Sequence, residues 1–165
     1  MIEIAAPQLI SPNATEPEVR QFLDENTFPI VDNARVTFVF HGQADHVDLR
    51  HWIYGLPANL PLRKIGTTNL WMRTVEFPDG SRVEYKFGVH RKGHEEWMHD
   101  PLNQQRATDP FGGNSVVHCA GYHDPEWARE IHDVPQGKIV SLALNSKAFH
   151  GPRVIRIYLP PKFKK

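Results

Sequence analysis

The 165-residue sequence carries 19 basic and 19 acidic side chains, so its formal net charge is zero. Nucleic-acid binding and attraction to anionic membranes both depend on a basic excess, so we expect neither partner. The single cysteine, Cys119, excludes an intrachain disulfide, and its apolar neighbours predict a buried structural thiol. The N-terminus lacks a signal-peptide pattern and no apolar run reaches membrane-spanning length, so we expect a cytoplasmic protein.

Residues 1–33 predict an N-terminal extension with one short helix. Thr15 can cap the start of a helix, and Glu18 stands three residues later as the partner in a capping box. The helix should end near Asn26. Because so short a helix is marginal alone, we expect it to dock through its apolar side.

From residue 34 to residue 120 the pattern predicts an all-β sandwich with six or seven short strands. Apolar residues recur there at every second position, which is typical of strands with one buried face. The strands are expected at 35–40, 47–52, 70–77, 82–89 and 114–120, with a brief pairing at 62–65. The expected core residues are Val36, Phe38, Phe40, Val47, Val75, Phe77, Val83, Tyr85, Phe87 and Val116.

One stretch, Trp97 to Ser115, is dense in turn-forming residues. Two Asp-Pro steps, at Asp100 and Asp109, frame it, and a Gly-Gly pair closes it. Asp bonds its own backbone, Pro fixes φ and Gly permits positive φ. We therefore predict one long, structured loop that leads into the closing strand at Asn114.

The remaining residues predict a linker at 121–136 and then a β-hairpin within 137–165, with strands at 138–144 and 153–159. A two-stranded hairpin cannot bury both of its faces and is marginal alone. We expect either that it docks back on the sandwich or that the chain is the N-terminal part of a longer protein, and its unpaired edge allows a homodimer by strand addition.

The ten histidines do not predict a metal site. His41, His46 and His51 are spaced by five, which scatters side chains along strand and loop, whereas zinc needs three or four converging ligands. No Gly-x-Ser-x-Gly elbow occurs, so no catalytic residue is assigned. No cofactor is expected.

Two of the four tryptophans, Trp52 and Trp97, lie in segments rich in Gly, Pro and Asn. Core packing is the usual role of tryptophan, but an exposed indole also provides a stacking surface for a sugar or an aromatic ring. Both readings remain open for these two residues.

Several segments together resemble a known family. They are Val36–Phe40, Leu70–Thr74, Pro78–Gly80, Val83–Phe87, Asp100–Asn103 and Gly113–Val116. This order resembles the early-set, immunoglobulin-like domain that precedes the catalytic domain of enterochelin-esterase-like proteins. It is also similar to the glycogen-binding module of glucan branching enzymes and of the AMP-activated kinase β subunit. The resemblance implies an immunoglobulin-like (early-set) β-sandwich at 34–120.

The C-terminal residues 137–165 resemble the opening hairpin of an esterase-type α/β-hydrolase domain. The resemblance implies a carboxylic-ester hydrolase as parent and a downstream hydrolase domain as partner. The nucleophile elbow and the triad would lie in that domain, so we expect this chain to be inactive alone.

For ligand binding, the resemblance to glycogen-binding modules implies contacts at Trp52, Lys86, Trp97 and Asn114. The apolar clamp of those relatives falls on Pro110, with Phe111 beside it, which departs from their pattern. In the siderophore-esterase branch the same domain shapes the catalytic pocket and binds no glucan. Three hypotheses follow: an accessory domain that positions a siderophore-type ester substrate, an α-glucan-binding module, or a plain interaction module.

Overall fold

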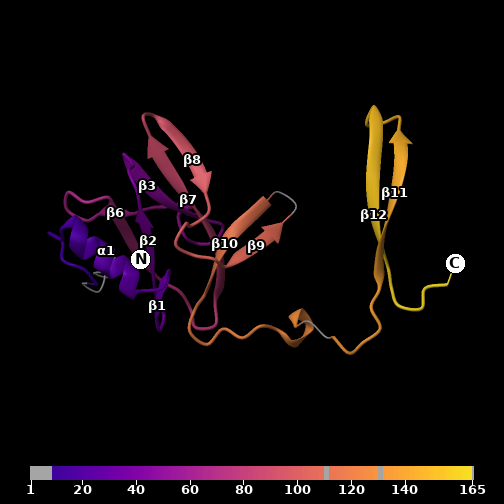
Figure 1. Ribbon diagram of the computed structural model, residues 1–165, viewed down its shortest axis with the longest axis horizontal. Coiled ribbons are helices and arrows are strands. Elements are labelled where there is room, and N and C mark those ends of the chain that lie inside the picture. Colours follow the sequence, from indigo (N-terminus) through magenta and orange to yellow (C-terminus); the bar gives the residue numbers. More distant parts are fainter. Residues whose placement is uncertain (1–8, 110–111, 130–131, 165) are drawn as a thin grey trace. The chain divides into compact units, whose positions relative to one another are not determined.

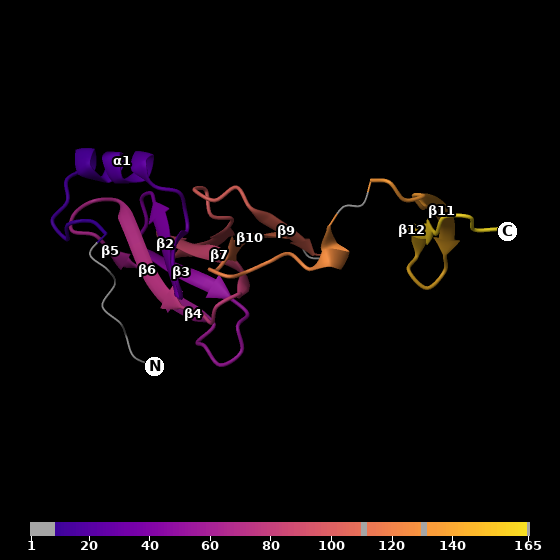
Figure 2. The same ribbon diagram turned by 90° about the horizontal axis from the view of Figure 1, so that it is seen from below.

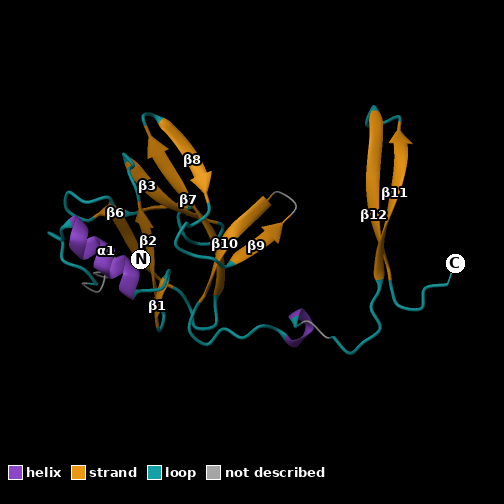
Figure 3. Cartoon of the chain, viewed as in Figure 1, coloured by secondary structure: helices purple, strands orange, loops and turns teal. Residues whose placement is uncertain are grey.

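The computed structural model describes residues 9–109, 112–129 and 132–164. Strands make up most of its regular structure (Figure 3). The chain divides into two compact units, Met1–His123 and Asp124–Lys165, which are treated separately below.

Helix α1 (Glu16–Glu25) begins and ends where the sequence predicts. The capping box is confirmed: Glu18 Oε2 accepts hydrogen bonds from Thr15 N at 2.7 Å and from Thr15 Oγ1 at 2.8 Å. Val19 and Phe22 are buried on the side of the helix that faces the first sheet. Docking through this apolar side therefore stabilises a helix that is too short to be stable alone.

The first unit contains two antiparallel sheets (Figure 1). The first sheet has the order β1 (Ile30–Asp32), β2 (Arg35–His41), β6 (Leu70–Glu76) and β5 (Arg63–Lys64). The second has the order β4 (Asn59–Pro61), β3 (His46–His51), β7 (Arg82–Arg91), β10 (Gly112–His118) and β9 (Arg106–Asp109). Strand β8 (His94–Met98) also pairs with β7, beyond the end of β10.

Helix α1 covers the outer side of the first sheet, so the unit has three layers (Figure 2). Strand β2 accordingly buries both of its faces: Phe38 points into the space between the sheets, and Val39 packs under the helix with Leu70 and Met72. The second sheet has one face in the core and one free of the helix layer, which is the face that concerns function below.

The core between the sheets contains nine of the ten residues expected from the alternation. Val116 is the exception. It is buried, but the register pairs it with Glu84, whereas its neighbour Val117 lies opposite Val83 and joins the core with Cys119. The expected burial of Val116 is confirmed, but alternate residues of a strand point to opposite faces, so Val116 lies outside the cluster between the sheets. Burial of Cys119 is confirmed, and this burial raises the pKa of its thiol.

The prediction of one long loop from Trp97 to Ser115 is wrong. Trp97 lies within β8, and residues 106–109 form β9, whose register pairs Thr108 with Gly113 of β10. The closing strand therefore begins at Gly112, two residues before the expected Asn114. Only the turn at 99–105 is irregular among the described residues of this stretch. Strands β1, β4 and β9 are short and lack an apolar alternation, so the sequence pattern alone does not reveal them.

The second unit contains a short 3₁₀ helix (Glu126–Ala128) and the hairpin of β11 (Lys138–Ser146) and β12 (Gly151–Leu159). The predicted hairpin is confirmed and is two residues longer at the turn end of each strand. Its register gathers aliphatic residues on one face: Val140, Leu142, Leu144, Ile155, Ile157 and Leu159. Strand addition and dimerisation through this hairpin stay predictions.

No helix within the described residues is long and apolar enough to cross a membrane.

Candidate ligand-binding site

The outer face of the second sheet brings the candidate residues together. In β7 the residues Val83, Tyr85, Phe87 and Val89 point into the core, so the residues between them point outward. The register places Arg50 of β3 opposite Lys86, and Trp97 of β8 opposite Gly88. Directly opposed residues of an antiparallel pair share one face, so Arg50, Lys86 and Trp97 all lie on this outer face.

Trp52 and Trp97 form an exposed aromatic pair on that face. Trp52 follows directly after β3, and its ring centroid lies 6.4 Å from that of Trp97 with an interplanar angle of 65°. The two side chains remain 63% and 52% exposed. Because both indoles keep so much surface open to solvent, they are available for stacking on a ligand ring.

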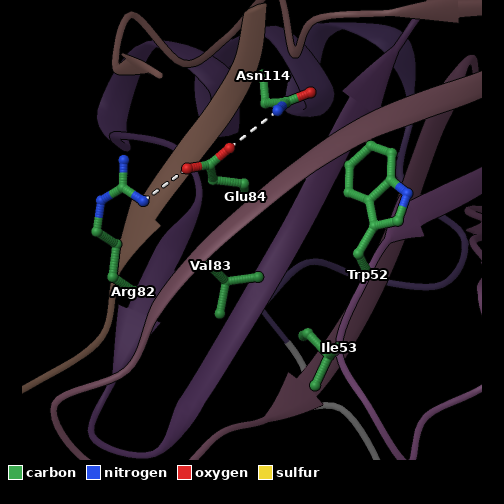
Figure 4. A pocket seen from close by; sticks show the side chains of 6 residues that line it. All are labelled: Trp52, Ile53, Arg82, Val83, Glu84 and Asn114. Carbon is green, nitrogen blue, oxygen red and sulfur yellow. Dashed lines mark hydrogen bonds and ion pairs between the residues drawn. The ribbon is translucent and has the colours of Figure 1, made fainter. Parts of the chain in front are cut away.

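Asn114 and Trp52 both line an open depression of about 470 Å³ (Figure 4). Asn114 Nδ2 donates a hydrogen bond to Glu84 Oε2 at 2.9 Å, and Arg82 Nη1 donates to Glu84 Oε1 at 2.7 Å. Figure 4 shows these three polar side chains in a row, with Trp52 on the other side of the depression. Ile53 and Val83 complete the lining.

All four candidate residues, Trp52, Lys86, Trp97 and Asn114, therefore lie on the outer side of the second sheet. Their role in binding stays a prediction. The clamp position at Pro110 and Phe111 lies outside the described residues.

Lys86 differs from the other cations of this face. Arg82 is paired with Glu84, and Arg50 is paired with Glu95 and Asp48. Within the described part of the chain, Lys86 has no ion pair or hydrogen bond through its side chain. Its ammonium group is therefore available to an anionic or hydroxyl-bearing ligand beside the tryptophans.

Sequence reasoning missed a second set of residues on this face: His46, Asp48, Arg50, His90 and Glu95. Asp48 Oδ1 lies 3.0 Å from His46 Nε2, and Asp48 Oδ2 lies 3.2 Å from His90 Nε2. The expectation from the sequence concerned the spacing of His41, His46 and His51 and did not connect His46 with His90, which the β3–β7 register pairs directly. The usable signal was the alternation itself: if Val47 and Leu49 face the core, then Asp48 and Arg50 face outward. In the described ranges, no group of three or more His, Cys, Asp or Glu side chains is placed to hold a metal ion.

A buried polar network holds the turn that follows Trp97. Tyr85 Oη donates to Asp100 Oδ2 at 2.6 Å, and Leu102 N donates to Asp100 Oδ1 at 2.8 Å. Asn103 Nδ2 donates to Tyr85 Oη at 3.0 Å and to the carbonyl of Val116 at 2.7 Å. Burial raises the pKa of Asp100, and burial with the neighbouring Asp100 raises the pKa of Tyr85. The network ties β7 and β10, which carry Lys86 and Asn114, to the turn that directly follows β8, the strand of Trp97.

His51 anchors the start of the segment that carries Trp52. Its Nδ1 accepts a hydrogen bond from Ile53 N at 3.1 Å, and the ring is buried. Burial lowers the pKa of His51, and the nearby backbone of Pro57 acts in the opposite direction. The folded state therefore disfavours protonation of the His51 ring. Protonation of Nδ1 would also break the hydrogen bond from Ile53 N, because a protonated nitrogen cannot accept.

We expect His51 to make the folded protein less stable in mild acid. Because its folded pKa lies below the unfolded value of about 6.5, its stabilising contribution is present above that pH and is lost as the pH falls below it. The free energy of unfolding, measured with urea, should decrease between about pH 7 and pH 5. The decrease should be smaller in His51→Gln, whose amide oxygen can still accept from Ile53. An equal decrease in His51→Gln would contradict this role, and the exposed His94→Gln serves as the control.

The fold defines the class of protein: it is an immunoglobulin-like β-sandwich with a short N-terminal helix and a C-terminal hairpin, as expected. This is the fold of the N-terminal region of enterobactin esterases. An enterobactin esterase from Shigella flexneri, solved in the presence of enterobactin, matches 84% of this chain with 43% of its own length, at 16% identity and a TM-score of 0.58. The enterochelin esterase of Shigella flexneri matches 78% of this chain, and 41% of its own, at 16% identity and a TM-score of 0.53. The ferric enterobactin esterase of Salmonella typhimurium matches 74% of this chain, and 40% of its own, at 16% identity and a TM-score of 0.52.

At this identity the likeness shows the fold alone, and the matched region corresponds to about 40% of the length of those esterases. No family model matches the sequence, and no curated protein matches it.

Proposed function

We propose that this chain is the N-terminal accessory domain of an enterobactin-esterase-like hydrolase, and that its outer sheet face contacts an aromatic ester substrate. The fold supports this, since it is that of the N-terminal region of esterases solved with enterobactin and with 2,3-dihydroxy-N-benzoyl-serine. Ester hydrolysis would belong to a downstream hydrolase domain. Cytoplasmic localisation stays a prediction.

The second unit supports the proposed hydrolase partner. A match over 84% of the 165 residues exceeds the 123 residues of the first unit, so it includes residues of the second. One face of the hairpin is mainly aliphatic, with Lys138 and Arg153 toward its two ends, and a two-stranded sheet leaves such a face exposed. Residues 137–165 would then supply the first strands of the hydrolase sheet, whose other strands would bury this face.

One observation carries the ligand assignment: an exposed tryptophan pair, Trp52 and Trp97, stands on the same sheet face as Lys86, whose ammonium group is unpaired within the described residues. An aromatic acyl group can stack on an indole. A phenolate or carboxylate on the same ligand would be attracted to the ammonium group. Dihydroxybenzoyl esters carry both kinds of group.

We expect Trp97→Ala to weaken binding of 2,3-dihydroxybenzoyl-serine at least about tenfold, because exposed tryptophans that stack on a ligand are typical hot spots. The dissociation constant would be measured by isothermal titration calorimetry on the full chain. Trp127→Ala is the matched control, since Trp127 is an exposed indole in the second unit. Equal affinities of Trp97→Ala and the unaltered chain would refute the assignment of this face.

An α-glucan-binding module is the second candidate. Trp52 and Asn114 line one depression, and an indole beside an amide suits a sugar ring with its hydroxyl groups. The same titration with β-cyclodextrin separates the two. Binding of cyclodextrin alone would replace the siderophore-type ligand with a glucan, and binding of neither would leave a plain interaction module.

A further inference from the structure

The indole of Trp97 is held in place by two neighbours. Its Nε1 donates a hydrogen bond to Glu95 Oε1 at 2.8 Å. The guanidinium carbon of Arg50 lies over the ring, 5.3 Å from its centroid. Arg50 Nη2 donates to the same oxygen, Glu95 Oε1, so one carboxylate oxygen joins the edge of the indole to the cation that lies on its face. The hydrogen bond to Glu95 therefore restrains the edge of the indole, and Arg50 restrains its face.

Arg50 is itself held firmly. Its side chain is only 13% exposed, its Nη1 donates to Asn59 Oδ1, and its Nη2 lies 3.7 Å from Asp48 Oδ2. Nη1 thus has a partner on β4, and Nη2 has partners on β8 and on β3 itself. Because these partners already fix the guanidinium group, Arg50 has little rotamer freedom left to lose when a ligand binds.

Gly88 provides the space for this arrangement. A Cβ atom at position 88 would stand 2.5 Å from Glu95 Oε1 and 2.8 Å from Arg50 Nε, which is closer than real Cβ contacts allow. Gly88 lies in the middle of β7, where glycine weakens a strand and has no turn to make. Its place is explained by the close passage of Arg50 and Glu95 across the strand.

We propose that Arg50, accommodated by Gly88 and joined to Glu95, is a positioning residue that holds Trp97 at its angle to Trp52 before any ligand binds. The inference rests on the proposed function for its ligand. A ring that is already ordered loses less side-chain entropy on binding, so its contacts contribute more to affinity. Both terminal nitrogens of Arg50 already have partners, and its Nε is buried, so Arg50 acts on a ligand through Trp97.

Two variants test this by independent routes. Gly88→Ala keeps every polar and aromatic side chain of the site but displaces Arg50 and Glu95. Arg50→Met keeps the apolar stem and removes the guanidinium group. Arg35→Met is the matched control, since Arg35 pairs with Glu76 on the other sheet.

The first readout needs no ligand. Two indoles in contact at an angle give a coupled pair of circular-dichroism bands in the far ultraviolet, and Trp97→Phe defines the part that comes from this pair. We expect Gly88→Ala and Arg50→Met to lose about half of this signal or more, and Arg35→Met to keep it. The second readout is the dissociation constant for 2,3-dihydroxybenzoyl-serine, which should rise about tenfold in both variants.

The proposal would be overturned if the coupled circular-dichroism bands were unchanged in both variants. It would also be overturned if these bands were reduced while the affinity for 2,3-dihydroxybenzoyl-serine stayed the same. If the unaltered chain binds neither 2,3-dihydroxybenzoyl-serine nor β-cyclodextrin, the proposed function fails. The coupled circular-dichroism bands still decide whether Arg50 positions Trp97. If Gly88→Ala does not fold, Arg50→Met decides alone.

Discussion

Replacing Asp100 with alanine is expected to lower the free energy of unfolding by about 3 kcal/mol, because it leaves one buried and one partly buried donor without an acceptor. Asp100 is fully buried and accepts from Tyr85 Oη and from Leu102 N. Each buried donor left unpaired costs roughly 1–3 kcal/mol. The pKa of Asp100 is raised by burial, so burying the carboxylate works against this gain, and we expect a loss in the lower half of the combined range of about 2–6 kcal/mol.

Urea unfolding followed by tryptophan fluorescence would measure this loss. Asp24→Ala is the control: Asp24 is an exposed aspartate of α1, so its replacement should change the free energy of unfolding by no more than about 0.5 kcal/mol. Asp100→Asn should lie between the two, because its amide oxygen can still accept from Leu102 N. If Asp100→Ala matched Asp24→Ala, the turn would be held by its local Asp-Pro chemistry, without the network.

The sequence identified this turn by its residue types but not by its partners. Asp-Pro and Asn are turn formers wherever they occur, so a turn near Asp100 was predictable. The acceptor role of Asp100 depends on Tyr85, which is 15 residues away and was assigned only to the core. A buried tyrosine needs a partner for its hydroxyl group, but only the β7–β10 register shows which partner it has.

The strands also differ in how far the sequence alone predicts them. β2, β6 and β7 have seven to ten residues and a clear alternation, so their positions and core faces were predictable. β9 has four residues, Arg-Ala-Thr-Asp, and acquires strand geometry only because β10 lies beside it. A strand defined by its neighbour leaves little trace in its own sequence.

The site shows a similar limit. Trp52, Lys86, Trp97 and Asn114 came from a family resemblance and fall on one sheet face. The role of Arg50 was not predicted. Nothing in the sequence of β3 shows that the Arg50 side chain passes over Gly88 of the next strand and reaches Trp97, two strands away.

Replacing Phe38 with alanine is expected to lower the free energy of unfolding by about 3–5 kcal/mol, a large part of the roughly 5–15 kcal/mol that stabilises a typical domain. Phe38 is fully buried between the sheets. Its ring centroid lies 4.7 Å from that of Tyr85 and 6.2 Å from that of Phe77, both in edge-to-face geometry. Truncation removes these contacts and leaves a cavity that two sheets cannot close without moving.

Urea unfolding would measure this effect, with Phe163→Ala as the control, since Phe163 is about half exposed in the second unit. A loss below about 1.5 kcal/mol for Phe38→Ala would show that the core relaxes into the space.

Tyr85 joins this core to the turn network, because its ring contacts Phe38 and its hydroxyl group donates to Asp100. Either substitution alone removes a contact that holds Tyr85 in place. When the other substitution is added, Tyr85 is already less ordered, so fewer native contacts remain to be lost. The double variant Phe38→Ala/Asp100→Ala should therefore lose less than the sum of the single losses, by about 0.5 kcal/mol or more. Strict additivity would mean that the core and the turn are stabilised independently, and that Tyr85 does not couple the core to the turn that follows Trp97.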